Sequence, residues 1–271
     1  MMSTSPLLVI QNLSKTFPVG GSLFGKKMGR QVLNNVSLTI SRGTTLGLLG
    51  ESGSGKTTLA RILLGLLPPS GGDIHFDGLD ITDLYGKVAL DIRCKMQFVF
   101  QDPYASLNPR KTVRFTLSEP LKIHGLYQSK GQEEKRIQDL LAHVQLPISS
   151  LDKYPNEFSG GQRQRIGIAR ALATKPSFIV LDEPVSALDV SIKAQIVNLL
   201  RDLQKSLGIA YLFIGHDLNI VGYLSDRVAV MCSGEIVEYG DPVALYKNPS
   251  HPYTKALLEA IPVPDPTYYK R

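Results

Sequence analysis

A glycine-rich stretch from Gly50 to Thr58, GESGSGKTT, carries the residue types and the spacing that hold a polyphosphate. It fits the pattern of a glycine, four residues and then Gly-Lys-Thr. Glycines let successive backbone N–H groups face an anion, the lysine reaches the β- and γ-phosphates, and the threonine hydroxyl can hold Mg²⁺. A chance glycine-rich turn is the alternative, but this stretch lies between a strand-like apolar run and a helix-forming segment, as the chemistry requires. The expected binding residues are Gly50, Glu51, Ser52, Gly53, Ser54, Gly55, Lys56, Thr57 and Thr58.

Polar side chains follow three apolar, strand-like runs further along the chain. Asp182 and Glu183 follow FIVL, Gln101 follows QFVF, and His216 follows YLFIG. Around a nucleotide, Asp182 would support Mg²⁺ and Glu183 would polarise an attacking water, while Gln101 can touch either. His216 can donate a hydrogen bond to a γ-phosphate; each residue alone also fits an ordinary solvated or structural role. The catalytic candidates are Glu183, His216 and Gln101, and the metal candidates are Thr57, Gln101 and Asp182.

A second anion site is predicted in the stretch FSGGQRQR, residues 158–165. Serine is a good helix cap, and the two glycines open the backbone at the start of an expected helix. An ordinary helix start in a basic setting is the alternative. Because the chain already has one phosphate loop, we expect this second seat to face the γ-phosphate held by another chain. Its expected nucleotide-binding residues are Ser159, Gly160, Gly161 and Gln162.

Strands and helices alternate through much of the sequence, which predicts an α/β fold with a mostly parallel sheet flanked by helices. Ligands of such sheets bind beyond the carboxyl ends of the strands, where the phosphate loop, Asp182 and His216 all fall. The pair Asp77-Gly78 is a strong signal for a hairpin turn.

Two further regions bear on domain organisation. Partly alternating patterns at 8–13 and 36–40 predict half-buried strands, joined by an exposed, glycine-rich loop that includes Arg30. The region 102–174 is predominantly helical and is interpreted as an inserted subdomain. Its first nine residues, DPYASLNPR, are rich in turn formers and are expected to form turns throughout.

The composition excludes several classes of protein. The 271 residues are 43% hydrophobic and carry a net charge of +6, with basic residues scattered rather than massed, so we expect no nucleic-acid partner. Cys94 and Cys232 lack the spacing of a metal site and are expected to be reduced thiols. No apolar run approaches the roughly 20 residues that span a bilayer, and the N-terminus lacks signal-peptide features. We therefore expect a cytosolic chain that reaches a membrane only through a partner.

Taken together, the motifs resemble the ATP-binding subunits of ABC transporters over nearly the whole chain. GESGSGKT, Gln101, FSGGQ, FIVLDEP, SALD at 186–189 and His216 occur in the order typical of that family. The resemblance implies an ABC-type P-loop ATPase that binds ATP and Mg²⁺, with an N-terminal antiparallel β subdomain, in a domain spanning 7–240. It also implies two chains that sandwich two ATP molecules. Each ATP would lie between the phosphate loop of one chain and the FSGGQ stretch of the other, which is called the signature. Phe17 matches the aromatic that stacks on adenine, and a core phenylalanine is the alternative.

Two stretches narrow the resemblance to the peptide-importer branch. QDPYASLNPRKTV, residues 101–113, is similar to that branch, and so is the tail NPSHPYTKALLEAIPVPDP, residues 248–266. The tail implies a C-terminal extension of the oligopeptide/dipeptide importer type over 241–271. It has no cysteine, so we expect no iron–sulfur cluster.

The implied function is that of the subunit that energises an importer of oligopeptides or dipeptides. Implied partners are a second ATPase subunit, either a related chain or a second copy, the transmembrane permease subunits and, indirectly, a solute-binding protein. The chain would then lie peripherally at the cytoplasmic face of the cell membrane, with Tyr104 and Leu107 of the DPYASLNPR segment exposed to the permease. A nickel or other metal importer of the same branch is the alternative, and a non-transport ABC ATPase acting on DNA or ribosomes is a more distant one.

Overall fold

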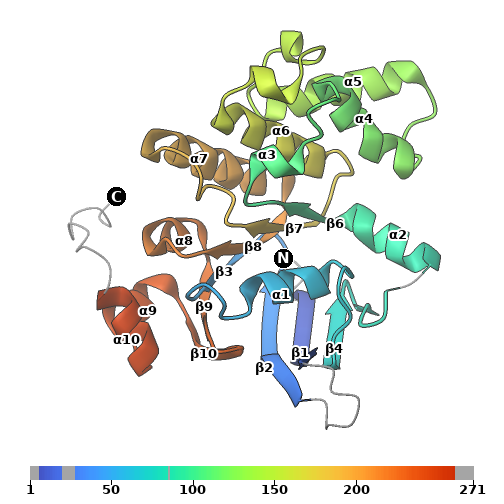
Figure 1. Ribbon diagram of the computed structural model, residues 1–271. Helices are drawn as coiled ribbons and strands as arrows, with labels where there is room; N and C mark the ends of the chain where they lie inside the picture. The colour runs from blue at the N-terminus through green and yellow to red at the C-terminus, as the bar shows by residue number, and fades with distance from the viewer. Residues whose placement is uncertain (1–5, 20–27, 85, 260–271) are drawn as a thin grey trace.

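Two β-sheets lie at the centre of the structure, a computed structural model that describes residues 6–19, 28–84 and 86–259 (Figure 1). One sheet is antiparallel, with the strand order β2-β1-β4-β5. Its strands are β1 (Pro6–Val19), β2 (Met28–Ser41), β4 (Gly71–Phe76) and β5 (Leu79–Asp80). This sheet is the antiparallel β subdomain that the resemblance implies.

The strands β1 and β2 are longer than the sequence pattern predicted. Each has 14 residues, so Arg30, expected in an exposed loop, belongs to β2 and pairs with Phe17 across the ladder. Residues 20–27 of the predicted loop lie outside the described residues. The predicted hairpin is confirmed, because Asp77 and Gly78 both have positive φ, 55° and 78°, between the antiparallel strands β4 and β5.

The second sheet has six strands in the order β10-β9-β3-β8-β7-β6. They are β3 (Thr45–Leu49), β6 (Met96–Val99), β7 (Phe178–Asp182), β8 (Ala210–Gly215), β9 (Arg227–Cys232) and β10 (Glu235–Gly240). All neighbours are parallel except β10, which runs antiparallel to β9. The prediction of a mostly parallel core is therefore confirmed.

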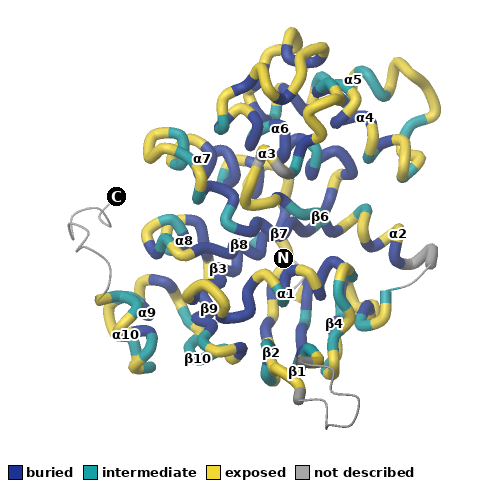
Figure 2. Tube along the Cα trace, viewed as in Figure 1, coloured by how far each residue is buried: buried dark blue, intermediate teal, exposed yellow. Residues whose placement is uncertain are grey.

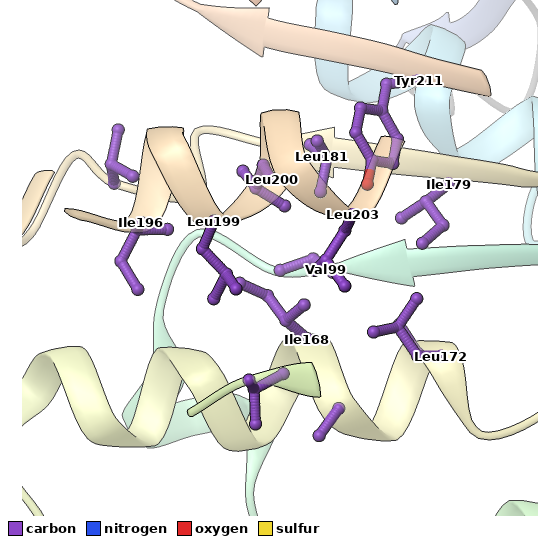
Figure 3. Close-up of a cluster of buried hydrophobic side chains, with 14 of the residues drawn as sticks. Val99, Ile168, Leu172, Ile179, Leu181, Ile196, Leu199, Leu200, Leu203 and Tyr211 are labelled. Carbon is purple, nitrogen blue, oxygen red and sulfur yellow. The ribbon is translucent and has the colours of Figure 1, made fainter. Parts of the chain in front are cut away.

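The central strands β3, β7 and β8 of this sheet are buried at every residue, which explains their largely apolar sequences. On β8, Tyr211 and Phe213 pack with α6 (Gly160–Leu172) and α7 (Val190–Leu207). Leu212 and Ile214 belong to the core on the opposite face, with α1 (Lys56–Leu63) and the antiparallel sheet. Figure 3 shows the first core, and Figure 2 shows how the burial follows the strands.

Helices dominate residues 102–174, as predicted. They are α3 (Pro103–Ser106), α4 (Val113–Ile123), α5 (Lys130–His143) and α6, with short 3-10 turns at Ile148–Ser150 and Pro155–Glu157. On α5 one face is apolar and buried, since Ile137, Leu140 and Leu141 are at most 1% exposed. In Figure 1 these helices lie together in the upper part of the view, above β6 and beside α7.

The DPYASLNPR segment differs from its prediction in two respects. Its first part forms the helix α3 instead of turns, because the Asp102 carboxylate accepts a hydrogen bond from the Tyr104 N–H over 2.7 Å and caps the helix. Leu107, expected on the surface, is only 3% exposed and belongs to the core shared with α4 and α6. Tyr104 is 65% exposed, so it alone keeps the expected surface position.

The remaining helices connect or follow the strands. They are α2 (Gly86–Lys95), α8 (Leu218–Leu224), α9 (Pro242–Lys247) and α10 (Pro252–Glu259). Within the described ranges, no helix combines the length and the apolar composition that crossing a bilayer requires. Cys94 and Cys232 are both free thiols.

Candidate functional site

The phosphate loop begins where β3 ends, at the centre of the six-stranded sheet. Gly50 and Gly55 have φ values of 155° and 114°. A Cβ on Gly50 would lie 2.2 Å from the carbonyl oxygen of Met231, and one on Gly55 would lie 3.0 Å from that of Val32. Since both obstacles are backbone atoms that cannot easily move, only glycine fits at these two positions.

Lys56 lies inside the loop that precedes it. Its side chain is 6% exposed, and Nζ donates hydrogen bonds to the carbonyl oxygens of Gly50 and Glu51, both over 2.7 Å. Burial lowers the pKa of Lys56, although the carboxylates of Glu183 and Asp182 oppose this shift. The loop therefore holds a cation at its centre by means of its own backbone.

The first turn of α1 carries the hydroxyl predicted for a metal. Gly55 caps this helix without a side chain, which leaves the first N–H groups available to an anion. The Thr57 hydroxyl donates a hydrogen bond to the carboxylate of Asp182, the last residue of β7. Asp182 is 7% exposed, and burial raises its pKa even though Thr57 and the nearby Lys56 oppose the shift.

Glu183 follows Asp182 in a strained backbone conformation. Its φ of 46° lies in the left-handed region, which costs a non-glycine residue about 1–3 kcal/mol. The Glu183 N–H donates to the carbonyl oxygen of Ile214 over 2.9 Å, and this bond helps to hold the turn. Oε2 of its carboxylate accepts a hydrogen bond from Nε2 of Gln101 over 3.1 Å and lies 3.2 Å from Nδ1 of His216. All three predicted catalytic side chains therefore meet at one oxygen.

These groups surround a cleft of about 570 Å³, a volume typical of ligand sites. Ten of its lining residues belong to the predicted phosphate loop or to the predicted catalytic set. They are Gly50, Ser52, Gly53, Gly55, Lys56, Thr57, Thr58, Gln101, Glu183 and His216, and Arg30 and Val32 line the cleft as well. Asp182 lines an adjacent cavity of about 480 Å³ that also reaches Thr57 and Gln101.

Ten predicted residues thus line the cleft directly, and two residues of the predicted loop lie just behind it. The carbonyl oxygen of Glu51 and the hydroxyl of Ser54 accept from Nζ of Lys56, over 2.7 and 3.4 Å. Arg30 and Val32 of β2 were missed. No local signal could have found them, because the pattern at 36–40 indicated a much shorter strand and left Arg30 in a loop.

Phe17 lies at the side of this cleft and is not one of its lining residues. It is half-buried, and its partner across the β1–β2 ladder is Arg30, which does line the cleft. Nζ of Lys15 lies 5.2 Å from the centroid of the Phe17 ring. The sequence left open whether Phe17 packs in the core or stacks on adenine. Its half-buried position agrees with both possibilities.

The predicted second anion site forms the start of α6. The Ser159 hydroxyl accepts from the Gln162 N–H over 3.3 Å, and Oε1 of Gln162 accepts from the Ser159 N–H over 3.0 Å. A Cβ on Gly161 would lie 2.5 Å from Cγ2 of Ile192 on α7, so the two helices approach closely there. Ser159 and Gln162 are exposed, and none of these signature residues, all of which the structure describes, lines the phosphate-loop cleft.

The segment after Gln101 is joined to the signature helix. The guanidinium carbon of Arg163, on α6, lies 3.8 Å from the ring centroid of Tyr104, on α3. Nε of Arg163 also donates to the carbonyl oxygen of Pro155 over 2.6 Å. A buried arginine therefore connects the segment after Gln101 to the helix that begins with the predicted second anion site.

Comparison with protein families gives two matches. A family profile described as ABC transporter matches residues 33–186. A second, described as the C-terminal region of oligopeptide/dipeptide transporters, matches residues 237–271.

Similar proteins cover nearly the whole chain. The dipeptide transport ATP-binding protein DppF of Lactococcus lactis subsp. cremoris is 50% identical over 268 residues, which are 98% of this chain and 84% of that protein. The oligopeptide transport ATP-binding protein OppF of Streptococcus mutans is 51% identical over 260 residues, which are 96% of this chain and 83% of that protein.

Solved structures share the fold. The structure of cbiO1 from Clostridium perfringens, described as part of the ABC transporter complex cbiONQ, has a TM-score of 0.78 at 30% identity and covers 90% of this chain and 91% of that one. The ATP-binding cassette MJ0796, in a dimeric post-hydrolysis state bound to ADP and Pi, has a TM-score of 0.75 at 31% identity. The match covers 87% of this chain and 98% of that one.

Proposed function

Because the chain belongs to the ABC transporter family, as an ATP-binding subunit of the oligopeptide and dipeptide import branch, we propose that its phosphate-loop cleft is the site of ATP hydrolysis. The chain is an ABC ATPase that hydrolyses ATP to drive peptide transport. In the proposal, the backbone N–H groups at the start of α1 and Nζ of Lys56 bind the phosphates. Glu183 polarises the water that attacks the γ-phosphate, with Gln101 and His216 beside it.

The observation that carries this assignment is the meeting of Gln101, Glu183 and His216 at one carboxylate oxygen, at the mouth of a glycine loop. Three different strands deliver these side chains to the same edge of the sheet. The strained φ of Glu183 supports the assignment, because residues held in such conformations cluster at active sites. In the proposal, His216 donates a hydrogen bond to the γ-phosphate.

The donor set fits Mg²⁺. The Thr57 hydroxyl and the buried Asp182 carboxylate lie together, and Gln101 lines the same cavity as both. In the described part of the chain, no group of three or more His, Cys, Asp or Glu side chains could hold a metal ion alone. This suits Mg²⁺, which is usually bound by one or two carboxylates together with substrate phosphates. When bound there, the ion would neutralise charge on the β- and γ-phosphates, and Thr57, Gln101 and Asp182 would hold it.

Adenine is proposed to lie against Phe17, at the side of the cleft formed by β1 and β2. The neighbouring Arg30 lines the cleft, so a bound nucleotide would lie within reach of its guanidinium group. A half-buried ring offers one face to a base while its other contacts fix its position.

ABC cassettes form dimers and belong to transporter complexes. We propose that a second ATPase subunit, a related chain or a second copy of this one, supplies its signature to the ATP held here. The exposed Ser159 and Gln162, outside their own chain's cleft, support this arrangement. Each chain then offers one phosphate loop and one signature.

The segment after Gln101, with its exposed Tyr104, is proposed as the contact with the permease subunits, together with the apolar rim of the adjacent cavity of about 480 Å³. Leu66 and Phe100 line this cavity and are 63% and 44% exposed, so an apolar surface lies next to Gln101. Through these subunits the chain would lie peripherally at the cytoplasmic face of the membrane, where ATP is available, and act indirectly with a solute-binding protein. We propose the domain division 7–240, with a helical subdomain at 102–174, and an extension at 241–271.

The experiment that tests this function is ATP hydrolysis by the chain in its reconstituted transporter complex, with the solute-binding protein present. Oligopeptides or dipeptides should stimulate hydrolysis, and Ni²⁺ should not. Stimulation by Ni²⁺ without any response to peptides would contradict peptide import and favour the metal-importer alternative.

A further inference from the structure

The C-terminal segment after β10 is docked on the nucleotide-binding core. In Figure 1, α9 and α10 lie together beside α8 and β10. Leu245 of α9 is 4% exposed and belongs to the same core as α6 and α7. Tyr246 and Tyr253 pack against that core and are partly buried. The segment therefore has a fixed position relative to the nucleotide site.

One contact joins this segment directly to the phosphate loop. The hydroxyl oxygen of Tyr253, on α10, accepts a hydrogen bond from the backbone N–H of Glu51 over 3.0 Å. Glu51 is the second residue of the loop, and its carbonyl oxygen accepts the bond from Nζ of Lys56. The peptide groups on the two sides of Glu51 are therefore held by Tyr253 and by the loop lysine.

Tyr253 is itself held in place by the strand that precedes the segment. The two carboxylate oxygens of Glu238, on β10, accept from the N–H groups of Ser250 and His251 over 2.8 and 3.1 Å. Nδ1 of His251 then accepts from the Tyr253 N–H over 3.1 Å. This chain of bonds fixes the first turn of α10, so the hydroxyl is presented to the loop by a rigid element.

A second contact reaches the segment that carries His216. The Tyr246 hydroxyl donates to the carbonyl oxygen of Leu218, the first residue of α8 and the second residue after His216. A Cβ on Gly222 would lie 2.6 Å from Cε2 of Tyr246, so the ring lies directly on α8. The C-terminal segment thus touches both the loop proposed to bind the phosphates and the helix that follows the proposed catalytic histidine.

We propose that Tyr253 is a positioning residue of the nucleotide site, through which the C-terminal extension sets the affinity of the chain for ATP. Its hydroxyl holds the first turn of the phosphate loop in the conformation that binds phosphate. Without it, the loop populates that conformation for a smaller fraction of the time, and the apparent affinity falls by that fraction. The inference rests on the ATP site proposed above.

The test compares two tyrosines that each lose one hydroxyl. Tyr253→Phe removes the bond to Glu51 and keeps the ring. Tyr223→Phe is the matched control, because the Tyr223 hydroxyl donates to Oδ1 of Asn198 over the same 3.0 Å but joins α8 to α7. Both variants and the wild-type chain are made at full length, and the dissociation constant for MgATP, the ATPase rates and amide hydrogen exchange are measured.

We expect Tyr253→Phe to raise the Kd and the KM for MgATP together, by about 2- to 12-fold, with kcat within about twofold of wild type. Amide exchange in residues 50–55 should become faster, since the Glu51 N–H loses its acceptor. Tyr223→Phe should leave affinity and exchange in the loop unchanged. A merely structural hydrogen bond would lower the unfolding temperature without this change in KM.

Three results would overturn the inference. One is a Kd and a KM for Tyr253→Phe that match those of Tyr223→Phe. Another is normal affinity in Glu238→Ala, which removes the carboxylate that anchors the start of α10 and should weaken MgATP binding in the same direction. The third is a wild-type chain that binds no MgATP, which would remove the proposed site itself and so is distinguishable from the first two.

Discussion

The side-chain amide of Gln101 donates a hydrogen bond over 3.1 Å to Oε2 of Glu183, and this bond joins the ends of β6 and β7. Nδ1 of His216, beyond the end of β8, lies 3.2 Å from the same oxygen. The carboxylate that is proposed to activate water is therefore restrained from two sides. A bound γ-phosphate that draws either neighbour away would release it, and Gln101 would pass that change to the segment that contains Tyr104.

Lys56→Ala should raise the Kd for ATP by more than about tenfold, because a hydrogen bond to a charged group contributes about 1.5–3 kcal/mol. Lys56 is only 6% exposed, and its ammonium group lies inside the glycine loop, where it can reach a bound phosphate. Equilibrium binding of a fluorescent ATP analogue measures the change, with the exposed Lys205→Ala on α7 as the control. An affinity within a factor of about two of wild type would show that Lys56 does not contact the phosphates.

Asp182→Asn should stabilise the protein in the absence of Mg²⁺ and nucleotide, while it abolishes hydrolysis. Burial raises the pKa of Asp182 above its ordinary value of 3.8, so the folded state binds more protons than the unfolded state. The free energy of unfolding therefore falls as the pH rises from about 3.8 through the pKa of the folded state, and it stays lower at higher pH.

The measurement for Asp182 is urea unfolding across that pH range. The stability gained by Asp182→Asn should be absent near pH 3.8 and present at neutral pH. Asp202→Asn, an exposed position on α7, is the control and should show no such pH-dependent difference. A variant that is less stable than wild type at neutral pH would mean that the Thr57 and Lys56 contacts outweigh the burial of the carboxylate.

Ser159→Arg should leave ATP binding by the isolated chain intact and abolish hydrolysis in the assembled transporter. The reason is that Ser159 lies outside its own chain's cleft and is proposed to serve the ATP of the partner. Ser129→Arg is a matched control, because Ser129 caps α5 with a bond of the same 3.3 Å length that Ser159 makes at α6. Lost ATP binding in the isolated Ser159→Arg chain would contradict a signature that acts across the dimer.

Most of the site could be predicted because its signals are local. A glycine loop between a strand and a helix, and polar residues at the ends of apolar runs, need only short patterns to be recognised. The parallel sheet then brings these patterns together at one edge, as the register Leu49–Gly215 and Val99–Leu181 shows. For this reason Gln101, Glu183 and His216 were predicted together without any knowledge of their distances.

The features that were missed depend on partners that are distant in the sequence. Arg30 reaches the cleft because β2 continues to pair with β1 far beyond its apolar pattern. Leu107 is buried because the helices of 102–174 close over it, which a turn-rich sequence does not indicate. The contact of Tyr253 with Glu51 joins residues that are 202 positions apart, and neither residue carries a local signal for it.

Single-turnover hydrolysis of MgATP by Glu183→Gln in the assembled transporter tests whether Glu183 activates the attacking water. The amide keeps the shape of the side chain and its place beside Gln101 and His216, but it cannot accept a proton. With the exposed Glu119→Gln on α4 as the control, we expect the rate to fall by about 10²- to 10⁴-fold while ATP remains bound and an ATP-bound dimer accumulates. Hydrolysis by Glu183→Gln at a rate near that of the control would show that Glu183 is not the base.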